Sequence, residues 1–308
     1  MTDSIEIKPI DYVCSDQSRN IGESMLGSAP VAWVWFLLEY DKAWGYDAID
    51  ESLIPDEVKK HLLMAMKELD PAMTLIIKQS AATPSNRKNF YVAVANENPK
   101  LYKVPLGNYE ALLDLDLVAM AKGDAYYERF RTDESIWLTC TNGMRDQCCS
   151  RVGGAVYNAF KETVGDAAWQ CSHVGGHRFS GNVVHFPSGV FYGRIEPEDV
   201  SHLISSENDN RLMHGNLRGR ACYPKPAQAA EGLLRERKPS LRSGDLRLRG
   251  MDAIDDHNWR VKFTEGGGRR THEMQIRKFE SSDKIYLSCL GEKQGPPTTY
   301  EIAEYQES

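Results

Sequence analysis

The sequence predicts a mixed α/β protein, with short strands and helices alternating along about the first two thirds of its 308 residues. Runs of β-branched and aromatic residues, typical of strands, alternate with runs whose apolar residues recur every three or four positions, as in helices. Near the C-terminus this alternation gives way to strand-like runs alone, which predicts a small antiparallel extension. The composition, 41% hydrophobic and 26% charged, is sufficient to bury a core.

The first predicted unit spans residues 29–130 and follows an arm, residues 1–28, whose polar residues and glycines predict little structure. Pro55 and the two acids after it are typical of a first helical turn, and Pro71 ends that helix. The other elements expected here are strands at 31–40, 73–78, 90–95 and 101–106, a turn at 83–86 and a helix at 109–120.

The second predicted unit spans residues 131–210. A short strand at 135–139 ends at Cys140, and a helix begins at Cys149. A strand at 167–171, a hairpin of 182–186 with 190–195 and a helix at 197–204 complete the unit. Both units therefore have the order strand, helix, strand, strand, strand, helix. This shared order predicts two thioredoxin-like units in tandem, the first of them without a metal.

The third segment, residues 211–308, is predicted to hold a helix at 226–237 and antiparallel strands at 256–263, 271–279 and 284–290. The chain as a whole has a net charge of −7, but residues 211–278 carry 16 Lys/Arg against 8 Asp/Glu. Such a basic face would suit docking of an acidic redox partner protein, and an ordinary solvated surface is the alternative. Few aromatic residues are interleaved with the basic ones, so a nucleic-acid partner is poorly supported.

The seven cysteines point to metal or redox chemistry. The N-terminal residues lack the basic start and apolar core of a secretory signal, so we expect a cytoplasmic protein. No apolar run approaches the length of a membrane helix. A disulfide framework is a poor interpretation of an odd number of cysteines in such a chain. Four of the seven lie within residues 140–171.

Two short segments hold the candidate ligands. The first reads CTNGMRDQCC from Cys140 to Cys149, and the second reads CSHVGGH and contains His173 and His177. Thiolates and imidazoles are ligands of iron–sulfur clusters and of zinc. Both segments follow strands of one small unit, so two cysteines and two histidines can face one point. Adjacent glycines between the histidines give the backbone freedom to turn both rings toward a metal.

Spacing favours a cluster over a single ion. In zinc sites of two cysteines and two histidines, the cysteines usually stand about two to four residues apart. Here the best pair is nine residues apart, Cys140 and Cys149, in a loop long enough to surround a larger group. A dithiol enzyme would need a Cys-x-x-Cys at the start of a helix, which the sequence lacks.

Together with HVGGHRFSGN, from His173 to Asn182, the first segment resembles the signature of the sucrase/ferredoxin-like family. The resemblance is close over residues 135–205 and extends to the later segment RGRACYPKPAQAAE. It implies a thioredoxin-like ferredoxin domain with a [2Fe–2S] cluster. Carried over by position, the implied ligands are Cys140, Cys149, His173 and His177. Cys148 falls on a free position of the signature, which leaves a spare sulfur beside a ligand.

Four further residues stand beside these ligands in the sequence and are candidates for contacts around the cluster: Arg145, Gly175, Gly176 and Asn182. Their alternative role is local turn structure.

An electron-transfer protein is the function that this site implies. Replacing two thiolates by imidazoles raises the potential from about −400 mV toward the range of about −150 to +300 mV. Imidazole ligands can also exchange protons, so the potential is expected to fall as pH rises. A reductase of a ferric chelate or another small oxidant, a redox or stress sensor and a zinc-stabilised interaction domain remain alternatives. No G-x-G-x-x-G motif or glycosidase-like carboxylate pair supports a nucleotide cofactor or sucrase activity.

Overall fold

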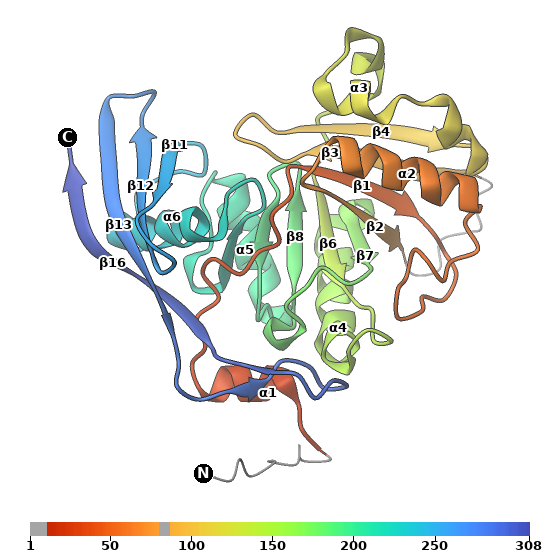
Figure 1. Cartoon of the computed structure of the whole chain (residues 1–308). Helices are drawn as coiled ribbons and strands as arrows, with labels where there is room; N and C mark the ends of the chain where they lie inside the picture. Colours follow the sequence, from red (N-terminus) through yellow and green to blue (C-terminus); the bar gives the residue numbers. More distant parts are fainter. Residues whose placement is uncertain (1–10, 80–86) are drawn as a thin grey trace.

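The computed structural model describes residues 11–79 and 87–308, so the turn expected at 83–86 lies outside the described residues. Figure 1 shows a large central sheet and, beside it, a smaller sheet formed by the C-terminal part of the chain. The helix α6 (Lys225–Arg237) contacts strands of both sheets. The prediction of a mixed α/β protein with an antiparallel C-terminal extension is therefore confirmed.

The large sheet has ten strands in the order β10-β9-β8-β6-β7-β2-β1-β3-β4-β5. They are β1 (Val34–Glu39), β2 (Ala72–Lys78), β3 (Lys88–Val94), β4 (Lys100–Leu106), β5 (Arg131–Thr132), β6 (Ile136–Cys140), β7 (Ala168–Cys171), β8 (Val183–Phe186), β9 (Val190–Tyr192) and β10 (Leu217–Arg220).

The two halves of this sheet repeat one arrangement. Strand β1 runs parallel to β2 and antiparallel to β3, and β6 likewise runs parallel to β7 and antiparallel to β8. The halves join where β2 pairs antiparallel with β7, with Ile77 opposite Cys171. Two tandem thioredoxin-like units require strands of the same order and direction in both halves. The assignment of thioredoxin-like units, with boundaries at residues 29–130 and 131–210, stays a prediction.

Alternating apolar residues explain how the halves pack. In β1, Phe36 faces a core shared with α2 (Asp56–Glu68) and α3 (Leu117–Lys122). Its neighbours Trp35 and Leu37 face the opposite side, where they share a buried cluster with Leu138 of β6. In the second half, α4 (Gln147–Val164) and α5 (Val200–Asn208) pack on the other face of β6. One core therefore fixes both halves relative to each other.

Two local predictions in the first 130 residues are wrong. The arm contains the helix α1 (Cys14–Asn20), whose residues Cys14 and Ser18 are buried although its sequence is largely polar. The helix expected at 109–120 is two elements, a 3₁₀ helix (Glu110–Asp114) followed by α3. The division occurs at Asp116, because its side chain accepts hydrogen bonds from two backbone N–H groups and so starts a new helix.

The C-terminal sheet contains β11 (Leu246–Ala253), β12 (Asn258–Glu265), β13 (Arg270–Glu280) and β16 (Thr298–Glu307), in that order. The strands expected at 256–263 and 271–279 correspond to β12 and β13. The strand expected at 284–290 is wrong, because only β14 (Ile285–Tyr286) forms there and it pairs with β15 (Gln294–Gly295) outside the main sheets. Residues 281–297, between β13 and β16, form a crossing segment that leaves the C-terminal sheet and lies next to α1 (Figure 1).

Within the described ranges, no helix combines the length and the apolar character needed to cross a bilayer.

Candidate metal centre

The first ligand loop connects β6 to α4. Cys140 ends the strand, where its backbone N–H donates to Asn182 O at 3.0 Å. The loop then turns back, and the side chain of Asp146 caps α4 by accepting from the N–H of Cys148. This cap places Cys149 in the first helical turn. The sulfurs of Cys140 and Cys149 are both buried, on the side of α4 that faces the strand end.

The second loop follows β7, the parallel neighbour of β6, so both ligand loops leave the same end of the sheet. His173 Nδ1 lies 3.7 Å from Cys149 Sγ and 4.0 Å from Cys140 Sγ. The ligand atoms of these three residues all lie within 4.8 Å of one another. Three of the four sequence-predicted ligands therefore face one point.

The fourth predicted ligand, His177, lies beside this group. Its ring stacks on that of His173 with centroids 5.2 Å apart. Its Nε2 bonds to Leu287 O at 2.5 Å, which requires the hydrogen to be on Nε2. Within the described residues, Nδ1 of His177 is buried and has no hydrogen-bond partner. An imidazole with one nitrogen bonded to a carbonyl and the other buried without a partner has the pattern of a metal ligand.

The electrostatics of the two thiols differ. A hydrogen bond from the Cys149 thiol, assisted by His173, holds the pKa of Cys140 well below its usual range. The same bond raises the pKa of Cys149, since it would have to give up a shared proton. Cys140 is therefore the easier of the two thiols to deprotonate. Burial instead raises the pKa of Cys171 well above its usual range, as for a core thiol.

A buried guanidinium holds the histidine loop, and the sequence patterns assigned it no role. Arg218 donates to Gly175 O, to Asn182 Oδ1, and to both the carbonyl and the hydroxyl of Ser28. Burial lowers its pKa to about 9. Because it is fully buried, it adds a positive charge inside the protein beside the cysteine and histidine loops.

The four residues predicted to surround the ligands fall into two groups. Asn182 donates to Gly176 O at 2.9 Å, and Gly175 and Asn182 both accept from Arg218. Gly176 has φ +70°, and a Cβ there would lie 2.5 Å from the Arg218 guanidinium. Arg145 instead pairs with Asp47 at 2.7 Å near the surface. Three of the four therefore belong to one network that shapes the histidine loop.

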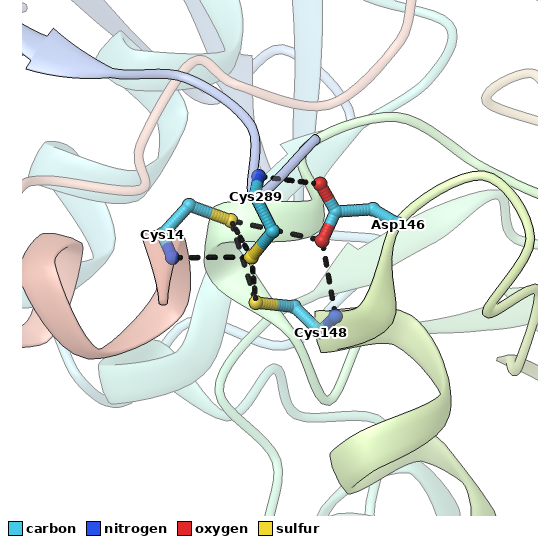
Figure 2. A group of neighbouring side chains, drawn as sticks. All are labelled: Cys14, Asp146, Cys148 and Cys289. Carbon is cyan, nitrogen blue, oxygen red and sulfur yellow. Dashed lines mark hydrogen bonds between the residues drawn. The ribbon is translucent and has the colours of Figure 1, made fainter. Parts of the chain in front are cut away.

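A second group of cysteines lies close by. It consists of Cys14, Cys148 and Cys289 together with the buried carboxylate of Asp146 (Figure 2). Cys148 therefore faces away from the Cys140 group, although it is adjacent to Cys149. Sequence patterns missed this group because its cysteines are separated by up to 275 residues.

Together, the fold and the site define an α/β protein with a buried cysteine and histidine group where two parallel strands end. The sucrase/ferredoxin-like family model matches residues 25–219, well over half of the chain. The protein belongs to the sucrase/ferredoxin-like family.

Among characterised proteins, the chain is similar to yeast proteins named altered inheritance of mitochondria protein 32. Identity is 31% over 90 residues for Debaryomyces hansenii and 35% over 91 residues for Meyerozyma guilliermondii. Each match covers 26% of this chain and 32% of the relative, so the chain matches about a third of their length. A variant of the thioredoxin-like [2Fe–2S] ferredoxin from Aquifex aeolicus matches with 18% identity and a TM-score of 0.25, over 28% of this chain and 100% of the ferredoxin.

Proposed function

We propose that this protein transfers electrons through a [2Fe–2S] cluster bound by Cys140, Cys149, His173 and His177. The observation that carries the proposal is the arrangement of these four residues. Two thiols and one imidazole have their ligand atoms within 4.8 Å of one another, and the second imidazole presents a buried, unpartnered Nδ1 among the described residues. This donor set, two sulfurs and two nitrogens, matches bis-histidine ligation of a two-iron cluster.

A cluster of this kind, when bound, takes up and releases one electron at a higher potential than an all-cysteine cluster. The protein contributes the surroundings that adjust this potential. The buried positive charge of Arg218 favours the more negative, reduced state. The carbonyl of Leu287 fixes the ring orientation of His177 through its hydrogen bond to Nε2.

The two histidines differ in their surroundings. Nε2 of His177 is occupied by the carbonyl of Leu287. His173 lines a pocket of about 210 Å³ together with Asp47, Asn142 and other residues. We propose that proton exchange coupled to electron transfer occurs at a histidine ligand, so that the potential falls as pH rises. A potential that is independent of pH from about 5 to 10, around the reference imidazole pKa, would contradict this part of the proposal.

We also propose that a redox partner protein docks on a basic face formed by exposed residues of the segment 211–278, such as Arg249 of β11 and Arg260 and Lys262 of β12. An acidic partner would bind this face through long-range attraction, so electron transfer should slow as salt is added. The cytoplasmic location expected from the N-terminal residues stays a prediction.

The test is an absorption spectrum of anaerobically purified protein, with iron and sulfide measured on the same sample. We expect visible bands that bleach with dithionite, with about two iron and two sulfide per chain, as a [2Fe–2S] cluster requires. Cys140→Ser, Cys149→Ser and His177→Ala should each lose this iron, while the control Cys222→Ser should keep it. A chain that holds neither iron nor sulfide after anaerobic reconstitution would overturn the proposal.

A further inference from the structure

The second cysteine group joins three parts of the chain that are far apart in the sequence. Cys14 lies in α1, Cys148 in the first turn of α4, and Cys289 in the crossing segment after β14. Figure 2 shows the three sulfurs pointing toward one another, with the carboxylate of Asp146 beside them. Cys14, Cys148 and Asp146 are fully buried. None of these four residues is a ligand in the proposed electron-transfer site.

The separations of the sulfurs suit a shared ligand. Cys14 Sγ lies 3.4 Å from Cys148 Sγ, Cys148 Sγ lies 3.1 Å from Cys289 Sγ, and the third separation is 3.5 Å. A circle through three such points has a radius of about 1.9 Å. A position about 2.3 Å from every sulfur, the usual zinc–sulfur distance, therefore exists just outside their plane. Thiols form only weak hydrogen bonds with each other, so a bound cation would hold three sulfurs this close together more strongly.

The carboxylate provides the fourth donor. Asp146 Oδ1 lies 3.9 Å from Cys14 Sγ, and all four ligand atoms lie within 4.8 Å of one another. Its other oxygen accepts from Cys289 N and Ser288 Oγ, each at 2.9 Å. These bonds orient the carboxylate in the way that surrounding residues orient metal ligands. Three sulfurs and one carboxylate oxygen are four ligands of kinds that zinc binds, the number that a tetrahedral site needs.

We propose that Cys14, Cys148, Cys289 and Asp146 form a second metal site that binds one Zn²⁺ ion. Soft thiolate ligands favour zinc over hard cations such as magnesium and calcium. On binding, each of the three thiols releases its proton to solvent, and no electron is transferred. The ion ties α1 and the crossing segment to the start of α4.

Because of its location, the proposed zinc site would also affect the histidine loop. The crossing segment contains Leu287, whose carbonyl bonds to His177, and Asp146 Oδ2 lies 3.7 Å from His177 Nε2. Zinc would therefore fix the segment that orients His177. The zinc site itself does not depend on the proposed cluster, because the two sets share no ligand.

The experiment measures zinc binding by the full chain. Reduced protein is titrated with Zn²⁺ in competition with a chromophoric chelator, and zinc, iron and sulfide are measured per chain. We expect one zinc per wild-type chain. Cys14→Ser and Cys289→Ser should each weaken binding by at least about tenfold, and the control Cys222→Ser should leave it unchanged. The double variant Cys140→Ser/Cys149→Ser should lose iron and keep zinc, which separates this proposal from the cluster.

A second measurement needs no substitution that could disturb folding. Co²⁺ added to reduced wild-type protein should give sulfur-to-metal charge-transfer absorption, which stoichiometric Zn²⁺ should abolish. The proposal is overturned if reduced wild-type protein takes up neither metal, or if Cys14→Ser and Cys289→Ser bind zinc as tightly as wild type. It is also overturned if the double variant of Cys140 and Cys149 loses the zinc.

Discussion

Gly153 of α4 tests how the two thiols of the first group are brought together. It lies four residues after Cys149, on the same helical face, and a Cβ there would collide with the carbonyl oxygen of Cys140 and lie 3.2 Å from its carbonyl carbon. At the neighbouring Gly154 a Cβ would point into open space, with no other segment within 4 Å. Of these two positions, only 153 therefore needs a glycine for α4 to approach the strand end that carries Cys140.

The substitution pair Gly153→Ala and Gly154→Ala isolates this contact. Both alanines gain about 0.8–1.0 kcal/mol in helix propensity. Only the alanine at 153 overpacks the core, at a cost of about 1–3 kcal/mol. The difference in the free energy of unfolding between the two variants is therefore the overpacking cost itself, because the propensity gain cancels. We expect Gly154→Ala to be the more stable by about 1–3 kcal/mol.

Guanidinium unfolding followed by tryptophan fluorescence measures this difference, with midpoints compared at equal slope. Iron and sulfide per chain after reconstitution give the second measurement. Compared with Gly154→Ala, the variant Gly153→Ala should have a lower unfolding midpoint and a lower iron and sulfide content, because the Cys140 backbone is displaced from Cys149. Equal stability and equal iron content in the two variants would refute the reasoning that this close approach sets the distance between the thiols.

Two further predictions concern the buried ionisable side chains of Arg218 and His185. Arg218→Met should cost several kcal/mol in unfolding free energy, because it leaves the acceptors of four hydrogen bonds without their donor, at about 1–3 kcal/mol for each buried group. Arg145→Gln removes an ion pair near the surface and should cost at most about 1 kcal/mol. Equal losses of unfolding free energy in the Arg218 and Arg145 variants would contradict this prediction. Burial lowers the pKa of His185 to about 4, so the unfolded chain binds the extra proton and stability falls as pH drops from about 6.5 toward 4. The loss of unfolding free energy is at most about 3 kcal/mol, a value limited by Glu207, which lies 3.5 Å from the ring. His185→Gln should flatten the dependence of the unfolding midpoint on pH. An unchanged slope would contradict this prediction.

Local patterns in the sequence were sufficient to predict most elements of the second unit and the chemistry of its loops. The strand ending at Cys140, the helix containing Cys149 and the histidine loop with adjacent glycines are short patterns with fixed spacing. Parallel neighbouring strands bring their ends to the same edge of a sheet, so the meeting of Cys140, Cys149 and His173 was predictable. Such local patterns depend on residues a few positions apart, which a sequence displays directly.

The surroundings of these loops could be read only from the folded chain. Arg218 contacts Ser28 across 190 residues, and Cys14 contacts Cys289 across 275. The segment expected to be a strand at 284–290 instead crosses the molecule to reach α1 and His177. Burial and hydrogen bonding between distant segments determine such contacts, and no local periodicity records them. Consequently the first group of ligands could be proposed from spacing, whereas the second metal site and the buried charge beside the histidines required the fold.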